Sequence, residues 1–116
     1  MRRKKDSEIE KDDEEIRPPP FTPDQAKRKI RLVLREGDTI FSNHLLKDIA
    51  SRRHGVSHQD VLYVLQNGDI ISPPEWDETH RSWKYKVEGA DLEDEELRAT
   101  TIIIEERLSI FIVTAY

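Results

Sequence analysis

The 116-residue sequence contains no cysteine, one methionine and four glycines. The absence of cysteine excludes disulfides, thiolate zinc sites and cysteine nucleophiles. No apolar run approaches the about 20 residues that a membrane-spanning helix needs, and no apolar stretch follows the charged start as in a signal peptide. The sequence also lacks H-E-x-x-H, a glycine-rich phosphate loop and G-x-S-x-G. We therefore expect a cytosolic protein with no membrane contact, no metal and no cofactor.

The start of the chain is dominated by charge. Its first 17 residues hold 13 charged side chains and three apolar ones, and Pro18-Pro19-Pro20 follow. Such a composition cannot bury enough apolar surface to offset the entropy lost on ordering, and consecutive prolines form a stiff extended joint. We predict a disordered arm over residues 1–20 and a single domain over residues 21–116.

Three helices are expected next. Thr22 is a typical N-cap, Pro23 suits the first helical position and Gln25 completes a capping box, so the first helix is predicted over residues 23–36. Ser42 is the predicted cap of a second helix that ends before Gly55. The Ser57-x-x-Asp60 box opens a third helix that ends near residues 67–68.

Strand patterns follow the helices. Apolar and polar residues alternate over 81–88, and two runs rich in β-branched residues, 97–104 and 108–115, are separated by three residues. The sequence therefore predicts an α+β domain, with two to three N-terminal helices packed on a curved antiparallel β-sheet of at least three strands.

The last two predicted strands are apolar on both faces, as in Ile102-Ile103-Ile104 and in 110–113. Helices can cover only one face of such a sheet. We expect the sheet to curl over part of its second face and a partner protein to contact the rest.

Charge is distributed unevenly along the chain. Residues 21–58 carry eight basic and four acidic groups, whereas residues 59–116 carry five and thirteen. Because phosphate neutralisation requires concentrated positive charge, any contact with RNA or DNA must use a small local patch.

The second predicted helix carries candidate catalytic and phosphate-binding residues. His44 lies four residues before Asp48 on one helical face, where the carboxylate could hold the imidazole in one tautomer for proton transfer. A histidine that only packs over the helix start is the alternative. Arg52 and Arg53 end this helix and either complement its dipole or clamp phosphate.

The segment 81–86 interleaves basic and aromatic residues, a pattern typical of strands that contact RNA. Lys84 and Lys86 are expected on one face, where they could neutralise charge at a scissile phosphate. Tyr85 is either an assisting catalytic residue or a core residue, because strand alternation also explains the pattern.

Five segments resemble the bacterial family called domain of unknown function 4258. They are Phe41-Ser-Asn-His44, Arg53-His-Gly55-Val-Ser-His-Gln-Asp60-Val61, Leu65-Gln-Asn-Gly68-Asp-Ile-Ile71, Trp83-Lys-Tyr-Lys-Val-Glu-Gly89 and Ile112-Val-Thr-Ala-Tyr116. The resemblance covers about residues 24–116. Because His54 is inserted before Gly55, either Arg52 or Arg53 takes the arginine position of the family.

That family is similar in layout to small toxins of the RelE and MqsR type, which cut messenger RNA and pair with an antitoxin protein. The resemblance implies an α+β domain with a basic RNA groove. The first hypothesis is a metal-independent endoribonuclease in which Arg53, Lys84 and Lys86 bind phosphate, His44 is the acid or base, and Tyr85 or Tyr116 assists. The second is a non-enzymatic protein-binding module that docks a partner through its exposed sheet face.

Overall fold

The computed structural model describes residues 17–52 and 55–116. Residues 1–16 of the arm expected over residues 1–20 lie outside this description. Within the described residues the order begins with three α-helices and an intervening strand: α2 (Pro23–Glu36), β1 (Asp38–Phe41), α3 (Asn43–Ala50) and α4 (His58–Asn67).

Each helix begins at the predicted cap. The Thr22 side chain accepts a hydrogen bond from the Gln25 backbone N–H while the Gln25 side chain accepts one from the Thr22 N–H. Ser57 and Asp60 form the same reciprocal box at the start of α4. These local hydrogen bonds satisfy backbone donors that a helix start otherwise leaves unpaired.

The remaining strands are β2 (Glu75–Asp77), β3 (Ser82–Ala90), β4 (Glu96–Ile104) and β5 (Ser109–Ala115), with a short 3₁₀ turn at Glu105–Arg107. They form a sheet of order β1-β5-β4-β3-β2 among the described residues. The meander from β2 to β5 is antiparallel, whereas β1 pairs with β5 in parallel. The predicted α+β class is therefore confirmed, and β1 and β2 extend the expected sheet into a mixed one.

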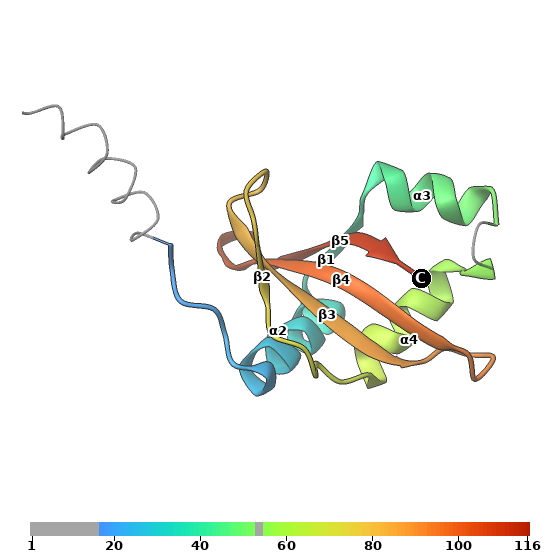
Figure 1. Ribbon diagram of the computed structural model, residues 1–116, viewed down its shortest axis with the longest axis horizontal. Helices are drawn as coiled ribbons and strands as arrows, with labels where there is room; N and C mark the ends of the chain where they lie inside the picture. Colours follow the sequence, from blue (N-terminus) through green and yellow to red (C-terminus); the bar gives the residue numbers. More distant parts are fainter. Residues whose placement is uncertain (1–16, 53–54) are drawn as a thin grey trace, which may run out of the picture.

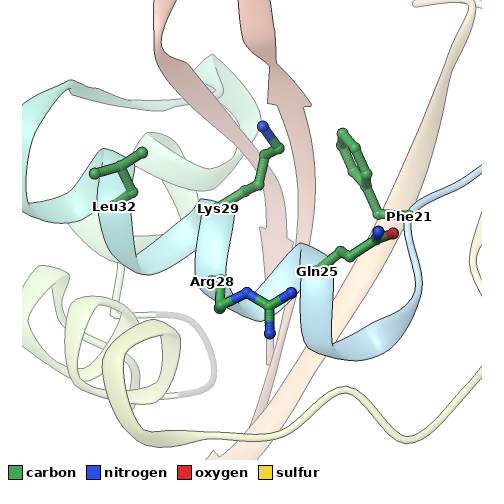
Figure 2. A pocket seen from close by; sticks show the side chains of 5 residues that line it. All are labelled: Phe21, Gln25, Arg28, Lys29 and Leu32. Carbon is green, nitrogen blue, oxygen red and sulfur yellow. The ribbon is translucent and has the colours of Figure 1, made fainter.

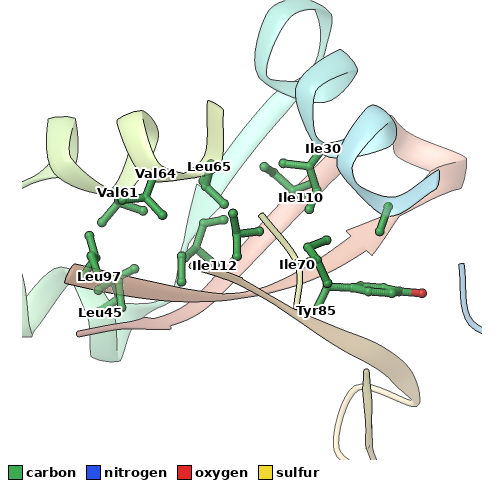
Figure 3. Close-up of a cluster of buried hydrophobic side chains, with 14 of the residues drawn as sticks. Ile30, Leu45, Val61, Val64, Leu65, Ile70, Tyr85, Leu97, Ile110 and Ile112 are labelled. Carbon is green, nitrogen blue, oxygen red and sulfur yellow. The ribbon is translucent and has the colours of Figure 1, made fainter. Parts of the chain in front are cut away.

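One face of the sheet, here called the inner face, carries the hydrophobic core. Helices α2 and α4 contact β3, β4 and β5 on this side (Figure 1). Figure 3 shows Ile30 of α2 and Val61, Val64 and Leu65 of α4 packed with Ile110 and Ile112 of β5. Burial of these side chains supplies the main favourable term in folding.

Helix α3 lies beside the C-terminal half of β5, at the side of that strand away from β4 (Figure 1). The Ser42 N–H donates to the Ile112 carbonyl at 2.9 Å, and its hydroxyl donates to the Val113 carbonyl at 2.7 Å. Because Ser42 is also the N-cap of α3, these bonds fix where the helix begins relative to the sheet.

The opposite side of the sheet, here called the outer face, faces away from α2 and α4. It is defined by residues that alternate with the core positions: Glu75, Asp77, Lys84, Lys86, Glu88, Arg98, Thr100, Ile102, Phe111 and Thr114. The tip of the β2–β3 hairpin curls over this face, where the His80 ring lies 5.3 Å from the Phe111 ring. Ile102 is consequently only 2% exposed. The expected curling of the sheet thus buries part of its second face.

The described end of the proline segment contacts the same hairpin. The Trp83 indole N–H donates to the Pro18 carbonyl at 2.7 Å, and the Arg17 guanidinium lies 4.8 Å from the centre of the Trp76 ring. The part of the arm nearest the domain is therefore attached to β2 and β3. In the described part of the chain, no helix has the length and apolar character needed to cross a membrane.

Candidate functional site

Lys84 and Lys86 project from the outer face of β3. Lys84 is opposite Ile102 of β4 and Lys86 is opposite Thr100, and both lysines alternate with the buried residues Tyr85 and Val87. Two residues of one strand that are separated by a single position point to the same face. The structure therefore brings this predicted pair together.

The Glu75 carboxylate of β2 lies beside the two lysines. The Lys86 ammonium is 3.0 Å from the Glu75 carboxylate, and Glu75 is the direct cross-strand partner of Lys84. The hydrogen bond and charge of Lys86, with a smaller contribution from Lys84, lower the pKa of Glu75. Among the described residues, Lys84 forms no ion pair within 4.0 Å. Over the whole outer face the three cations Lys84, Lys86 and Arg98 are matched by three carboxylates, Glu75, Asp77 and Glu88, and Lys84 is the cation that forms no ion pair among the described residues.

Arg98 is a further outer-face cation, which the sequence interpretation missed. It is opposite Glu88 on β3, and its guanidinium lies 3.6 Å from the Glu88 carboxylate. The alternation of side chains along 97–104, together with antiparallel pairing to the preceding strand, would have indicated Arg98. Every second residue of β4 points to the face that carries Lys86. Arg98 extends the line of cations along the outer face.

Tyr85 lies on the inner face, separated from the two lysines by the sheet itself. It is buried, and its hydroxyl accepts a hydrogen bond from the Phe21 backbone N–H at 2.8 Å. Burial raises the pKa of this hydroxyl, and the bond from Phe21 only partly offsets the effect. The structure thus gives Tyr85 a packing position and does not bring it together with Lys84 and Lys86.

His44 lies at the first turn of α3, beside β5. Its Nε2 is 3.3 Å from the Asp48 carboxylate, the contact expected from the four-residue spacing. Strand β4 separates β5 from β3, so the two strand axes lie about 10 Å apart, and α3 is on the far side of β5. His44 is therefore not at the lysine pair.

Arg53 and Tyr116 are the remaining residues that the sequence analysis proposed for the site. Arg53 lies outside the described residues. Tyr116 follows the end of β5, where its backbone N–H and carbonyl pair with those of Arg98. This pairing places the C-terminus at the Arg98 end of the outer face, away from the hairpin tip.

His80 is a second residue that the sequence interpretation missed. It lies at the tip of the β2–β3 hairpin, and its Nδ1 is 3.0 Å from the Asp77 carboxylate. Burial alone would raise the pKa of Asp77, but hydrogen bonds from the His80 ring and from the His80 and Thr79 backbone N–H groups outweigh it and lower the pKa. No local pattern in 75–82 indicates that the hairpin brings this histidine over β5.

The basic surface of α2 is the rival place for an anion. A hollow there is lined by Phe21, Gln25, Arg28, Lys29 and Leu32 (Figure 2). Lys29 is paired with Glu105 at 2.8 Å, and elsewhere on the helix Lys27 is paired with Asp69. Arg28 points away from Lys29 in Figure 2. Two of the lysines of α2 are therefore already paired with carboxylates.

The arrangement is that of a small α+β protein whose sheet is covered by helices on one face and carries interspersed cations and carboxylates and a histidine on the other. A family model described as domain of unknown function 4258 matches residues 41–116, about two thirds of the chain. The chain therefore belongs to this family, as its motifs indicated. The match includes α3, α4 and strands β2 to β5. Neither a curated protein nor a solved structure matches the chain.

Proposed function

We propose that the protein is a toxin-like endoribonuclease that cleaves RNA without a metal ion and is held in check by an antitoxin protein. The outer face of β3 and β4 is its RNA-binding surface in this proposal. The observation that supports it best is the pair of lysines, Lys84 and Lys86, on one face, where Lys84 forms no ion pair among the described residues. Ammonium groups at this spacing can bind successive phosphate oxygens and stabilise charge that develops during cleavage.

The position of the surface also supports the proposal. Helices α2 and α4 cover the inner face, so a polymer of RNA can approach β3 and β4 only from the outer side. Thr100, opposite Lys86, and Thr114, opposite Thr100, provide hydroxyl groups on the same face. Cations that follow the phosphate backbone, together with hydroxyl groups that can bond to phosphate oxygens, are one component of a surface for single-stranded RNA.

The test is expression of the wild-type chain and of the double variant Lys84→Ala, Lys86→Ala, followed by growth measurement and by RNA cleavage with purified protein in the presence of a chelator. We expect growth arrest and cleavage with the wild type, and a loss of both with the double variant. The matched control is Arg28→Ala, Lys47→Ala, which removes two exposed cations from α2 and α3 and should leave activity unchanged.

Thermal unfolding of each variant excludes a folding defect, because an ion pair at the surface such as Lys86–Glu75 contributes little to stability. Wild-type protein that neither arrests growth nor cleaves RNA would overturn the proposal and favour the protein-binding module. Equal activity of the wild type and the double variant would overturn the assignment of the surface.

A further inference from the structure

The histidine at the tip of the β2–β3 hairpin is held in a fixed orientation. Its Nδ1 lies 3.0 Å from one oxygen of Asp77, while the other oxygen accepts the backbone N–H groups of Thr79 at 2.9 Å and His80 at 3.2 Å. The Asp77 side chain is only 12% exposed. A carboxylate bound in this way accepts a hydrogen bond from the Nδ1–H group of the neutral ring. The lone pair on Nε2 then remains available.

The ring is also restrained from the side of the sheet. It packs on Phe111 of β5 with the two planes tilted by 47°. Phe111 in turn is the cross-strand partner of Ile102, which is buried beneath this contact. The imidazole is therefore supported by an apolar surface on one side while 42% of its side chain remains exposed.

Asp77, the residue that orients the histidine, lies near the lysine pair. Asp77 is opposite Ser82, and Glu75 is opposite Lys84, so Asp77 and Lys84 are diagonal neighbours across β2 and β3, about 7–8 Å apart. The hairpin tip and the two lysines thus flank the same part of the outer face. An RNA strand whose phosphate contacts Lys84 would bring an adjacent ribose within the range of the tip.

We propose that His80 is the group that removes the proton from the ribose 2′-hydroxyl of RNA bound at Lys84 and Lys86, and that Asp77 is its positioning residue. This inference rests on the proposed function. The 2′-hydroxyl proton passes to Nε2 while the 2′-oxygen forms a bond to phosphorus and the bond from phosphorus to the 5′-oxygen breaks. The departing 5′-oxygen takes a proton from water, and the imidazolium returns its proton to solvent. The products are a 2′,3′-cyclic phosphate and a 5′-hydroxyl.

The chain offers a matched control in its other His–Asp pair. His44 and Asp48 are 3.3 Å apart, but the His44 side chain is 70% exposed and lies on α3, beyond β5. A general effect of removing a histidine or a His–Asp contact would appear equally at both places. A catalytic effect would appear only at the hairpin tip.

The experiment measures single-turnover cleavage of a short RNA, and binding of the same RNA with 2′-O-methyl groups, for the wild type and for His80→Gln, His80→Ala and His44→Ala. We expect both His80 variants to lose about 10²–10⁴-fold in cleavage rate, with binding unchanged within about twofold because the lysines remain. Added imidazole should restore part of the rate of His80→Ala. His44→Ala should behave as the wild type.

The role of Asp77 is tested by single-turnover cleavage and RNA binding of Asp77→Asn. The side-chain amide that replaces the carboxylate can donate to Nδ1 and favour the ring tautomer that has its proton on Nε2. The cleavage rate should therefore fall by at least about tenfold while binding of the 2′-O-methyl RNA stays unchanged. An unchanged cleavage rate, or a loss of RNA binding equal to the loss of rate, would contradict a positioning role.

The outcomes separate the two proposals. If the wild type cleaves RNA and His80→Gln and His80→Ala cleave at the same rate, the role of His80 is overturned while the RNA-cleaving function stands. If the wild type does not cleave RNA, both are overturned. Cleavage products that end in a linear 3′-phosphate from the first time point, or in a 3′-hydroxyl, would contradict attack by the 2′-oxygen.

Discussion

The two faces of the sheet are built from the same strands but have different chemistry. On the inner face Val87, Leu97 and Ile112 are buried against α2 and α4, and the polar group of Tyr85 is paired with backbone. On the outer face Lys84, Lys86 and Arg98 are interspersed with carboxylates, and the hairpin tip contacts Phe111 beside the buried Ile102. Substitutions on the inner face should therefore lower the free energy of unfolding, whereas most substitutions on the outer face should change function.

The largest expected effect is that of Ile112→Ala on the inner face. Ile112 is fully buried, and a cavity at such a site costs about 3–4 kcal/mol of unfolding free energy. Ile40→Ala is the matched control, because Ile40 is on the outer side of the edge strand β1 and is 44% exposed, so its loss should cost less than about 1 kcal/mol. Equal costs in urea unfolding would contradict the division between the faces.

A smaller effect is expected for Ile102→Ala, the position at which the outer face is covered. Since the hairpin tip and Phe111 bury this side chain, we expect a cost of about 2 kcal/mol. Urea unfolding measures it. A cost below about 0.5 kcal/mol would show that the hairpin tip does not pack on β4 and that the outer face is open there.

Tyr85→Phe tests the polar contact of the inner face. It leaves the Phe21 N–H without its acceptor and should cost about 1 kcal/mol at neutral pH. Because burial raises the pKa of Tyr85 in the folded protein, the unfolded chain ionises first as the pH rises above about 10, and wild-type stability falls there. The difference between wild type and variant should therefore shrink at alkaline pH. A constant difference between pH 7 and the alkaline range would contradict the burial of this hydroxyl.

The smallest effect is expected for Asp77→Asn on the outer face. The folded pKa of Asp77 is lowered, so its ionised form contributes stability above the unfolded pKa of about 4, and this contribution is lost as the pH falls through the folded value. The variant should cost less than about 1 kcal/mol near neutral pH and nothing at lower pH. Thermal unfolding across this range measures the difference, which should narrow with acid and never widen.

The helices were predictable because their signals are local. Thr22, Ser42 and Ser57 each cap a helix through a residue three positions further along the chain, so a short window of sequence contains the whole interaction. The three longest strands were predictable for a similar reason, since their alternation and the short connection at 105–107 are visible in sequence.

The remaining features depend on contacts between distant segments. Strand β2 has three residues, and it is defined by pairing with β3 and by the contact between Trp76 and Trp83. The parallel pairing of β1 with β5 joins residues about 70 positions apart. The site residues also differ in how local their signals are. Strand alternation was enough to predict that Lys84 and Lys86 share a face, whereas the position of His80 over Phe111 depends on how the hairpin bends across the sheet.

The most direct test of the outer face as the RNA site is NMR mapping with a short RNA that carries 2′-O-methyl groups and is not cleaved. Addition of this RNA should shift the backbone amide signals of β3, β4 and the hairpin tip, with Lys84, Lys86 and His80 among the strongest. The amides of α2 around Arg28 and of α3 around His44 should stay unchanged. Shifts concentrated on α2 or α3, or no shifts at saturating RNA, would contradict the account.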